Sequence, residues 1–303
     1  MSLAPLELWL PALAHIEPAH PLRRLLARGD RRDDGPRGYL AGLADYFHTA
    51  TPLPAAALTR ELAAGDAGQA TWLSADPAWV EPDLSGARLL ACGQLGLQQA
   101  DAQALAEPLR ELFAEVGMPL ETTTPDRWHL RLPPGSQVPC FPAPEQALGE
   151  PLLQHLPQGA EGRRWRVLLT EAQVLLHQHP LNAQRRAAGQ PPINSLWLWG
   201  AGQLPEAVRT SVLGVVGDDA LLRALAARAG IAARARTPEA LPDAPPGWLF
   251  DLQDLPAQLL ATEWWPTIEA VARRRPLRLS FASGERWQTG PWQRWRFWRG
   301  ARA

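Results

Sequence analysis

Several residue types are missing or rare in this sequence, and each scarcity limits what the protein can be. Lysine is absent, so all 30 basic residues are arginine. The two cysteines, Cys92 and Cys140, have no Cys-x-x-Cys spacing and are too few for a disulfide framework. The formal net charge of −1 provides no overall attraction to nucleic acid or to an anionic membrane.

Long apolar runs and a secretory signal are also missing. No run approaches the roughly 20 apolar residues that span a bilayer. The first residues carry Glu7, His15 and Glu17 and lack the basic start of a signal peptide. These features predict a cytoplasmic protein with no membrane partner. Hydrophobic residues make up 46% of the 303, which is enough for a packed core in two domains or in one large α/β domain.

The first part of the chain predicts a compact antiparallel α+β unit after a short strand at 6–10 and several helices. Apolar residues recur at alternate positions in four segments and at helical spacing after Asp101. The expected order is ββαββ, with the helix beginning at Asp101 and the strands at 71–80, 87–92, 120–124 and 128–132.

The second part predicts a mainly parallel sheet, because strands alternate with helices of ten or more residues. The predicted strands are 193–199, 211–216, 231–235, 247–252 and 277–281, and the predicted helices are 162–177, 218–229 and 256–273.

Prolines recur between residues 133 and 144 and predict a linker, because proline at this density continues neither a strand nor a helix. We therefore expect three segments: N-terminal helices with the ββαββ unit at 1–135, a Pro-rich linker at 136–160, and an α/β domain at 161–303.

The most distinctive segment combines fixed motifs over about 25 residues. His-Pro-Leu-Asn at 179–182 is followed by Arg185-Arg186, a Gly-Gln-Pro-Pro-Ile-Asn turn at 189–194, and an apolar strand that ends in Gly-Ala-Gly at 200–202. This arrangement resembles the archaeal-type, cofactor-independent phosphoglycerate mutases of the alkaline phosphatase superfamily. The Trp-x-x-Ala-Asp-Pro run at 72–77 also resembles a bacterial branch whose members are often labelled phosphoglycerate-mutase-like or regulatory.

The resemblance implies an alkaline-phosphatase-like sheet and metal-assisted phosphoryl transfer. In that family two divalent ions, usually manganese or zinc, lie between Asp and His ligands, and a Ser or Thr hydroxyl attacks phosphorus. The ions neutralise charge on the phosphoryl oxygens and lower the pKa of the nucleophile.

This sequence departs from the family at the positions expected to bind metal. The first strand ends in Leu10-Pro11 without an Asp, and the strand at 277–281 leads to Glu285-Arg286 where the family has Gly-Asp-His. All seven histidines lie in the first 179 residues. We therefore expect no metal and no other cofactor, and retain as weak acidic candidates Asp218, Asp251 and Asp254. For Asp218-Asp219, capping of the following helix is the favoured alternative.

The distinctive segment also contains a candidate anion site, composed of His179, Arg185, Arg186 and Asn194. Guanidinium groups bind phosphate or carboxylate oxygens in pairs without a metal. The alternative is that the segment only caps the sheet.

The C-terminal tail interleaves arginine with tryptophan from Arg286 to Arg299. Such a tail can stack and neutralise single-stranded nucleic acid. The favoured interpretation is instead an amphipathic strand whose tryptophans pack on the core, so a nucleic-acid partner is not expected.

These features favour a degenerate, non-catalytic phosphoglycerate-mutase-like protein with a regulatory or binding role. The expected partner is a phosphorylated small molecule or another protein. The alternatives are a mutase or phosphatase with a rearranged metal site, and a nucleic-acid-associated regulator that uses the tail. No catalytic residue is assigned.

Overall fold

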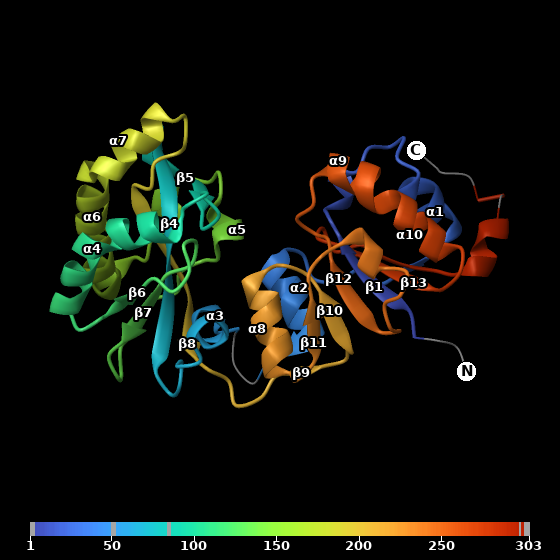
Figure 1. Ribbon diagram of the computed structural model, residues 1–303, viewed down its shortest axis with the longest axis horizontal. Helices are drawn as coiled ribbons and strands as arrows, with labels where there is room; N and C mark the ends of the chain where they lie inside the picture. The colour runs from blue at the N-terminus through green and yellow to red at the C-terminus, as the bar shows by residue number, and fades with distance from the viewer. Residues whose placement is uncertain (1–3, 50–52, 84–85, 297, 300–303) are drawn as a thin grey trace. The chain divides into compact units, whose positions relative to one another are not determined.

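The computed structural model describes residues 4–49, 53–83, 86–296, 298 and 299 (Figure 1). The chain forms two compact units. Unit 1 consists of Met1–Ala50 together with Ala207–Ala303, and unit 2 is the continuous segment Thr51–Glu206.

Unit 1 is built on a mainly parallel sheet whose central strand comes from the N-terminal part of the chain. In the described residues its strand order is β11-β10-β12-β1-β13-β14-β2. The strands from β11 to β13 are parallel, whereas β14 and β2 are added antiparallel at one edge. The strands are β1 Leu6–Leu10, β2 Asp30–Arg32, β10 Gly214–Val216, β11 Ala232–Arg234, β12 Trp248–Asp251, β13 Leu277–Phe281 and β14 Arg286–Thr289.

All five residues of β1 are buried because helices cover both faces of the sheet. Leu6, Leu8 and Leu10 lie in the main hydrophobic cluster of the unit. That face is covered by α1 (Leu22–Arg28) and by a continuous helix made of α9 (Ala257–Leu259), a π-helical turn (Leu260–Trp264) and α10 (Trp265–Ala272).

The other face of the sheet is covered by α2 (Tyr39–Tyr46) and α8 (Ala220–Arg228) (Figure 1). Trp9 projects from β1 toward α2, where a Cβ added at Gly42 would lie 2.2 Å from the Trp9 ring. A short ladder of β3 (Phe47–His48) with β9 (Arg209–Thr210) completes the unit.

Unit 2 contains an antiparallel sheet built around the long strand β4 (Thr71–Asp83). Its other strands are β5 Gly86–Cys92, β6 Leu120–Glu121, β7 His129–Leu132 and β8 Ser195–Gln203. Helices α4 (Gln99–Glu115) and α6 (Gly159–Gln178) contribute to the apolar cluster on one face, together with Leu73 and Ala75 of β4. Helix α3 (Ala55–Ala64) packs on the opposite face, where Gly200 and Gly202 of β8 allow its close approach.

The predicted mixed α/β class is confirmed, and the predicted ββαββ elements are present close to their expected positions. One predicted strand belongs to a different sheet from the one expected. The segment predicted at 193–199 was expected in the parallel sheet, but as β8 it pairs antiparallel with β4, from Ala78↔Ser195 to Thr71↔Gln203. The prediction failed because alternation of strands with helices does not specify which strand is the partner.

The compact units also differ from the predicted division of the chain. The Pro-rich stretch lies inside unit 2, where the indole Nε1 of Trp197 donates a hydrogen bond to the Pro142 carbonyl at 3.0 Å. Phe141 meets Trp165 edge to face at 5.5 Å, and α5 (Pro144–Ala147) lies in this stretch. Proline density identified irregular backbone correctly but did not reveal that this backbone packs on a core.

The interpretation that the tail tryptophans pack on the core is wrong for three of them. Trp287 does pack, edge to face with Phe281 at 5.5 Å. Trp292, Trp295 and Trp298 are instead 83%, 58% and 70% exposed. The last strand, β14, ends at Thr289, and the tail continues as a 3₁₀ turn at Pro291–Trp295. Beyond the strand, side chains no longer alternate between a buried and an exposed face, so the tryptophans are not placed on the core.

None of the described helices is both long enough and apolar enough to span a bilayer.

The central position of β1 generates a stability prediction. Leu8 is fully buried between the strands from the C-terminal part of the chain, so Leu8→Ala should lower the free energy of unfolding of unit 1 by about 2–5 kcal/mol. The loss should appear as faster hydrogen exchange in β12 and β13. Leu213→Ala is the control, because Leu213 is 64% exposed. Unchanged exchange in these strands after Leu8→Ala would contradict the placement of β1.

Candidate functional site

The carboxyl ends of the parallel strands in unit 1 gather several charged and aromatic side chains. This edge of an α/β sheet is where ligands commonly bind. The residues at or just beyond it are Trp9 near the end of β1, Asp218 and Asp219 after β10, Arg236 after β11, and Asp251 and Asp254 at and after β12. We call this set the carboxyl-edge cluster.

Arg236 connects the three acidic residues predicted from the sequence. Its guanidinium forms an ion pair with the Asp254 carboxylate, and Nε lies 3.7 Å from Oδ2 of Asp218. Nη1 also donates to the backbone carbonyl of Asp251 at 3.2 Å. The Arg236 backbone N–H donates to Oδ1 of Asp218 at 3.1 Å, which holds the backbone after β11 against the end of β10. The sequence analysis did not single out Arg236, although its place directly after the predicted strand at 231–235 was an available signal.

Asp251 is the buried member of the cluster, with 1% of its surface exposed. Its pKa is raised from 3.8 to about 7, chiefly by burial and in addition by the neighbouring carboxylates of Asp254 and Asp219. Gly217 encloses this carboxyl closely, since an added Cβ there would lie 3.1 Å from the Asp251 Cβ. Asp251 is therefore a proton-holding group near neutral pH.

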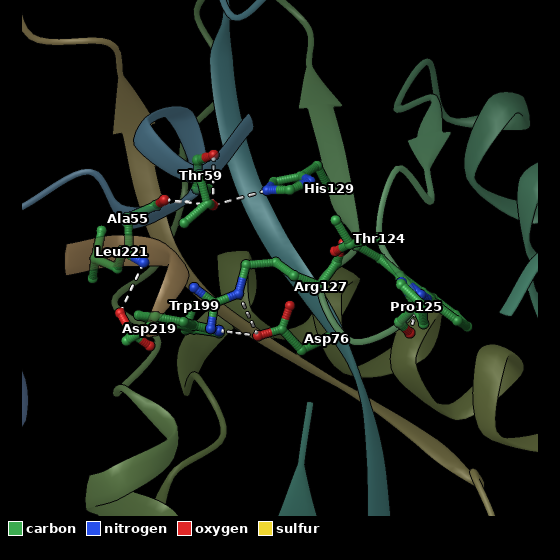
Figure 2. Close-up of polar contacts among 12 residues, drawn as sticks. Ala55, Thr59, Asp76, Thr124, Pro125, Arg127, His129, Trp199, Asp219 and Leu221 are labelled. Atoms are coloured by element: carbon green, nitrogen blue, oxygen red, sulfur yellow. Dashed lines mark hydrogen bonds and ion pairs between the residues drawn. The ribbon is translucent and has the colours of Figure 1, made fainter. Parts of the chain in front are cut away.

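Asp219 caps α8, which confirms the capping alternative for this residue. Its Oδ1 accepts hydrogen bonds from the backbone N–H groups of Leu221 at 2.8 Å and Leu222 at 2.9 Å; Figure 2 shows the first. The same oxygen accepts a hydrogen bond from the Tyr39 hydroxyl. The Tyr39 ring stacks on Trp9 with centroids 5.4 Å apart, so the end of β1 is covered by aromatic rings.

The carboxyl-edge cluster does not fit the dinuclear metal centre that the resemblance implies. The carboxylates of Asp218 and Asp254 are paired with a guanidinium, and that of Asp219 is engaged with a helix terminus and a hydroxyl. In the described part of the chain, no three or more His, Cys, Asp or Glu side chains are grouped to hold a metal ion.

Glu285 and Arg286 stand after β13, where the mutase family has Gly-Asp-His. Glu285 accepts a hydrogen bond from the Ser283 hydroxyl at 2.5 Å. The neighbouring Arg286 pairs with Asp45 at 2.6 Å. The side chains at this position are therefore occupied by contacts within unit 1.

The predicted anion site in unit 2 consists largely of groups that already have partners. His179 caps α7 (Pro180–Ala187), its Nδ1 accepting from the Leu181 N–H at 3.3 Å. Arg185 is 4% exposed and donates to the carbonyls of Pro191 at 2.9 Å and Leu95 at 2.7 Å. Burial lowers the pKa of Arg185. Its guanidinium therefore stabilises the fold of the loop.

Asn194 and Arg186 complete the predicted anion site, and their environments differ from those of His179 and Arg185. The Asn194 side chain accepts from the Val80 N–H at 2.8 Å and donates to the Val80 carbonyl at 2.7 Å, so it pairs with β4 like a strand residue. Arg186 is exposed. Sequence analysis missed Asn182, which is fully buried and makes three hydrogen bonds of 2.7 Å to Leu176 and Ile193. Anion binding at this segment stays a prediction.

A second polar cluster in unit 2 lies on the face of the sheet covered by α3 (Figure 2). Asp76, 1% exposed, accepts a hydrogen bond from the Trp199 indole at 2.7 Å and lies 3.6 Å from Nε of Arg127. Burial raises the pKa of Asp76 to about 6. Nε2 of His129 lies 2.9 Å from the Thr59 hydroxyl, and burial lowers the pKa of this histidine to about 3, which keeps it neutral.

The comparisons with known proteins support one family relationship. No family model matches the sequence. A 72-residue segment, 24% of this chain, is 36% identical to the 2,3-bisphosphoglycerate-independent phosphoglycerate mutase of Methanosarcina mazei. A 62-residue segment, 20% of this chain, is 39% identical to a probable enzyme of the same name from Geobacter sulfurreducens. This segment of the chain is distantly homologous to the cofactor-independent phosphoglycerate mutases.

The homology is limited in extent, because the matched segments span only 18% and 16% of the lengths of those two mutases. Among solved structures, a cofactor-independent phosphoglycerate mutase from Thermoplasma acidophilum has a TM-score of 0.41 at 13% identity, with 95% of this chain and 90% of that chain covered. A protein from Pyrococcus horikoshii has a TM-score of 0.45 at 14% identity, with 96% and 88% covered.

The contacts of the two neighbouring arginines in α7 predict a large loss of stability for one mutation and almost none for the other. Arg185→Ala removes the donor from the buried Leu95 carbonyl and from the part-buried Pro191 carbonyl, and should lower the free energy of unfolding by about 2–4 kcal/mol. Arg186→Ala removes an exposed side chain and should change it by less than about 0.5 kcal/mol. Chemical denaturation of both variants measures the difference. Equal stability of the two variants would show that the buried guanidinium is not structural.

The buried carboxyl groups predict that stability falls as pH rises. Asp251 has a folded-state pKa of about 7 against an ordinary 3.8, so between these values the folded state holds a proton that the unfolded state has lost. Asp251→Asn removes the contribution of this carboxyl and should stabilise the protein by about 3 kcal/mol more at about pH 8 than at about pH 5. Denaturation at both pH values measures it.

The pH slope should be reduced by Asp251→Asn but not abolished, because burial also raises the pKa of Glu7 to about 7. Asp243→Asn, at an exposed position in the same unit, is the control and should keep the wild-type slope. An unchanged slope in Asp251→Asn would contradict the burial of that carboxyl.

Proposed function

We propose that this chain is a degenerate phosphoglycerate-mutase-like protein that binds a ligand or partner and does not transfer a phosphoryl group. The observation that carries the proposal is the position of Arg236. Its guanidinium lies among the carboxylates of Asp218 and Asp254 and against the backbone carbonyl of Asp251, at the edge where a mutase of this family would use divalent ions. A permanent side-chain cation replaces an exchangeable metal there.

The net negative charge of the carboxyl-edge cluster also supports the proposal that the protein does not transfer a phosphoryl group. Asp218, Asp219, Asp251 and Asp254 contribute four carboxyl groups near a single guanidinium. A phosphate ester approaching this edge meets net negative charge, whereas phosphoryl transfer requires positive charge on the phosphoryl oxygens. A guanidinium that is already paired with Asp254 has little capacity left to bind them.

A regulatory or binding role is the one proposed for a carboxyl edge that lacks metal chemistry. Homology to the mutases makes a phosphorylated metabolite the first ligand to test, and a protein partner the second. The competing function is a mutase or phosphatase with a rearranged site, which would require a metal held by residues outside the carboxyl-edge cluster.

Metal analysis combined with an activity assay tests the proposal. Purified wild-type protein should contain far less than one Mn or Zn per chain and should not convert 3-phosphoglycerate to 2-phosphoglycerate when Mn²⁺ is added. Arg236→Met keeps the length of the side chain and removes its charge. This variant should bind Mn²⁺ more tightly than wild type in calorimetric titration, because two carboxylates lose their cation.

Arg234→Met is the matched control, since Arg234 is the last residue of β11, two positions before Arg236, and its guanidinium lies 4.5 Å from the centroid of the Trp248 ring. Its Mn²⁺ binding should equal that of wild type. Nearly two Mn or Zn per wild-type chain, or turnover of 3-phosphoglycerate by the wild type, would overturn the proposal in favour of an enzyme.

A further inference from the structure

A groove of about 590 Å³ lies in unit 1, away from the carboxyl-edge cluster. It is lined by residues from three segments: Arg24 and Arg28 of α1, Trp265 and Arg273 of α10 and its end, and Arg294 and Trp295 of the C-terminal turn. All of these segments belong to unit 1. We call this the α1–α10 groove.

Among the described residues, three of the arginines that line the groove have guanidinium groups with no hydrogen-bond or ion-pair partner. Arg273 is paired with Glu269 at 3.0 Å. In the described part of the chain, the guanidinium groups of Arg24, Arg28 and Arg294 make no hydrogen bond or ion pair. The neighbouring tail residues Arg296 and Arg299 differ, because both pair with Asp30. The groove therefore carries uncompensated positive charge from separate segments.

Exposed aromatic rings lie beside these charges. Trp295 is 58% exposed and Trp292 is 83% exposed, although tryptophan normally buries most of its surface. The Arg294 guanidinium lies 4.9 Å from the centroid of the Trp295 ring, which places a positive charge next to a stacking surface.

The overall charge of unit 1 favours an anionic partner. Unit 1 contains 20 of the 30 arginines but 15 of the 31 acidic residues, a formal charge of +5, whereas unit 2 has a formal charge of −6. The net charge of −1 for the whole chain conceals this separation.

We propose that the α1–α10 groove and the adjoining Trp292 bind single-stranded nucleic acid. Guanidinium groups would contact the phosphates while unpaired bases stack on the exposed indole rings, which is the combination used by sequence-tolerant single-strand binders. A duplex offers the same phosphates but keeps its bases stacked internally. An acidic peptide would satisfy the arginines but would leave the protruding Trp292 without a matching surface.

Fluorescence anisotropy tests this proposal on the full chain, with labelled oligo(dT) and oligo(rU) of about 12 nucleotides. Wild type should bind both more tightly than a duplex of equal length. The logarithm of its affinity should fall with the logarithm of salt concentration with a slope of about −2, as expected for three phosphate contacts. Trp292→Ala and Trp295→Ala should each weaken binding at least about fivefold.

Charge variants separate groove binding from general attraction. The double variant Arg24→Gln/Arg294→Gln should make the salt slope shallower by about 1.4. Its control, Arg163→Gln/Arg164→Gln, removes two exposed arginines from α6 and should keep the wild-type slope. For the tryptophans the control is Leu153→Ala, at a residue 62% exposed in unit 2. Thermal midpoints should confirm that every variant is folded.

Three outcomes would overturn the proposal. They are absence of oligonucleotide binding by wild type at low salt, a wild-type salt slope in Arg24→Gln/Arg294→Gln, and competition by a polyglutamate peptide that is as effective as unlabelled oligo(dT). The last outcome would assign the groove to an acidic peptide.

Discussion

The pairing of β1 with β12 and β13 is the constraint on which unit 1 depends. Every residue of β1 is buried, and its register runs parallel to strands that begin more than 200 residues later. Because parallel neighbours align their carboxyl ends, this pairing brings Trp9, Asp251 and the segments after β10 and β11 to one edge. The carboxyl-edge cluster therefore exists only because distant parts of the chain meet across β1.

At that edge, charge is balanced within the protein itself. Arg236 compensates Asp218 and Asp254, Asp219 is stabilised by the N-terminus of α8, and Asp251 avoids charge by retaining a proton. A catalytic metal site leaves such carboxylates dependent on an ion from solution. This difference makes the edge a polar surface whose charges are balanced by groups of the protein itself.

Local patterns in the sequence predicted most elements, because hydrophobic periodicity reports which side of a helix or strand is buried. They did not predict that β8 joins β4, since seven cross-strand pairs depend on residues about 120 positions apart. Arg185 was predicted as a ligand contact because guanidinium groups bind anions, but backbone carbonyls accept its hydrogen bonds. The Asn194 side chain is likewise paired with the backbone of Val80. Trp292 and Trp295 were assigned to the core because periodicity cannot show where a strand ends.

The insertion of unit 2 between the two parts of unit 1 has a consequence for biosynthesis. All of Thr51–Glu206 is available to fold before the strands that flank β1 have been made. At translation rates of about 5–20 residues per second, the apolar face of β1 waits roughly 12–50 s for β12 to emerge. During this interval Leu6, Leu8 and Leu10 lack their native neighbours, so the nascent chain presents a hydrophobic strand that chaperones or aggregation partners can reach.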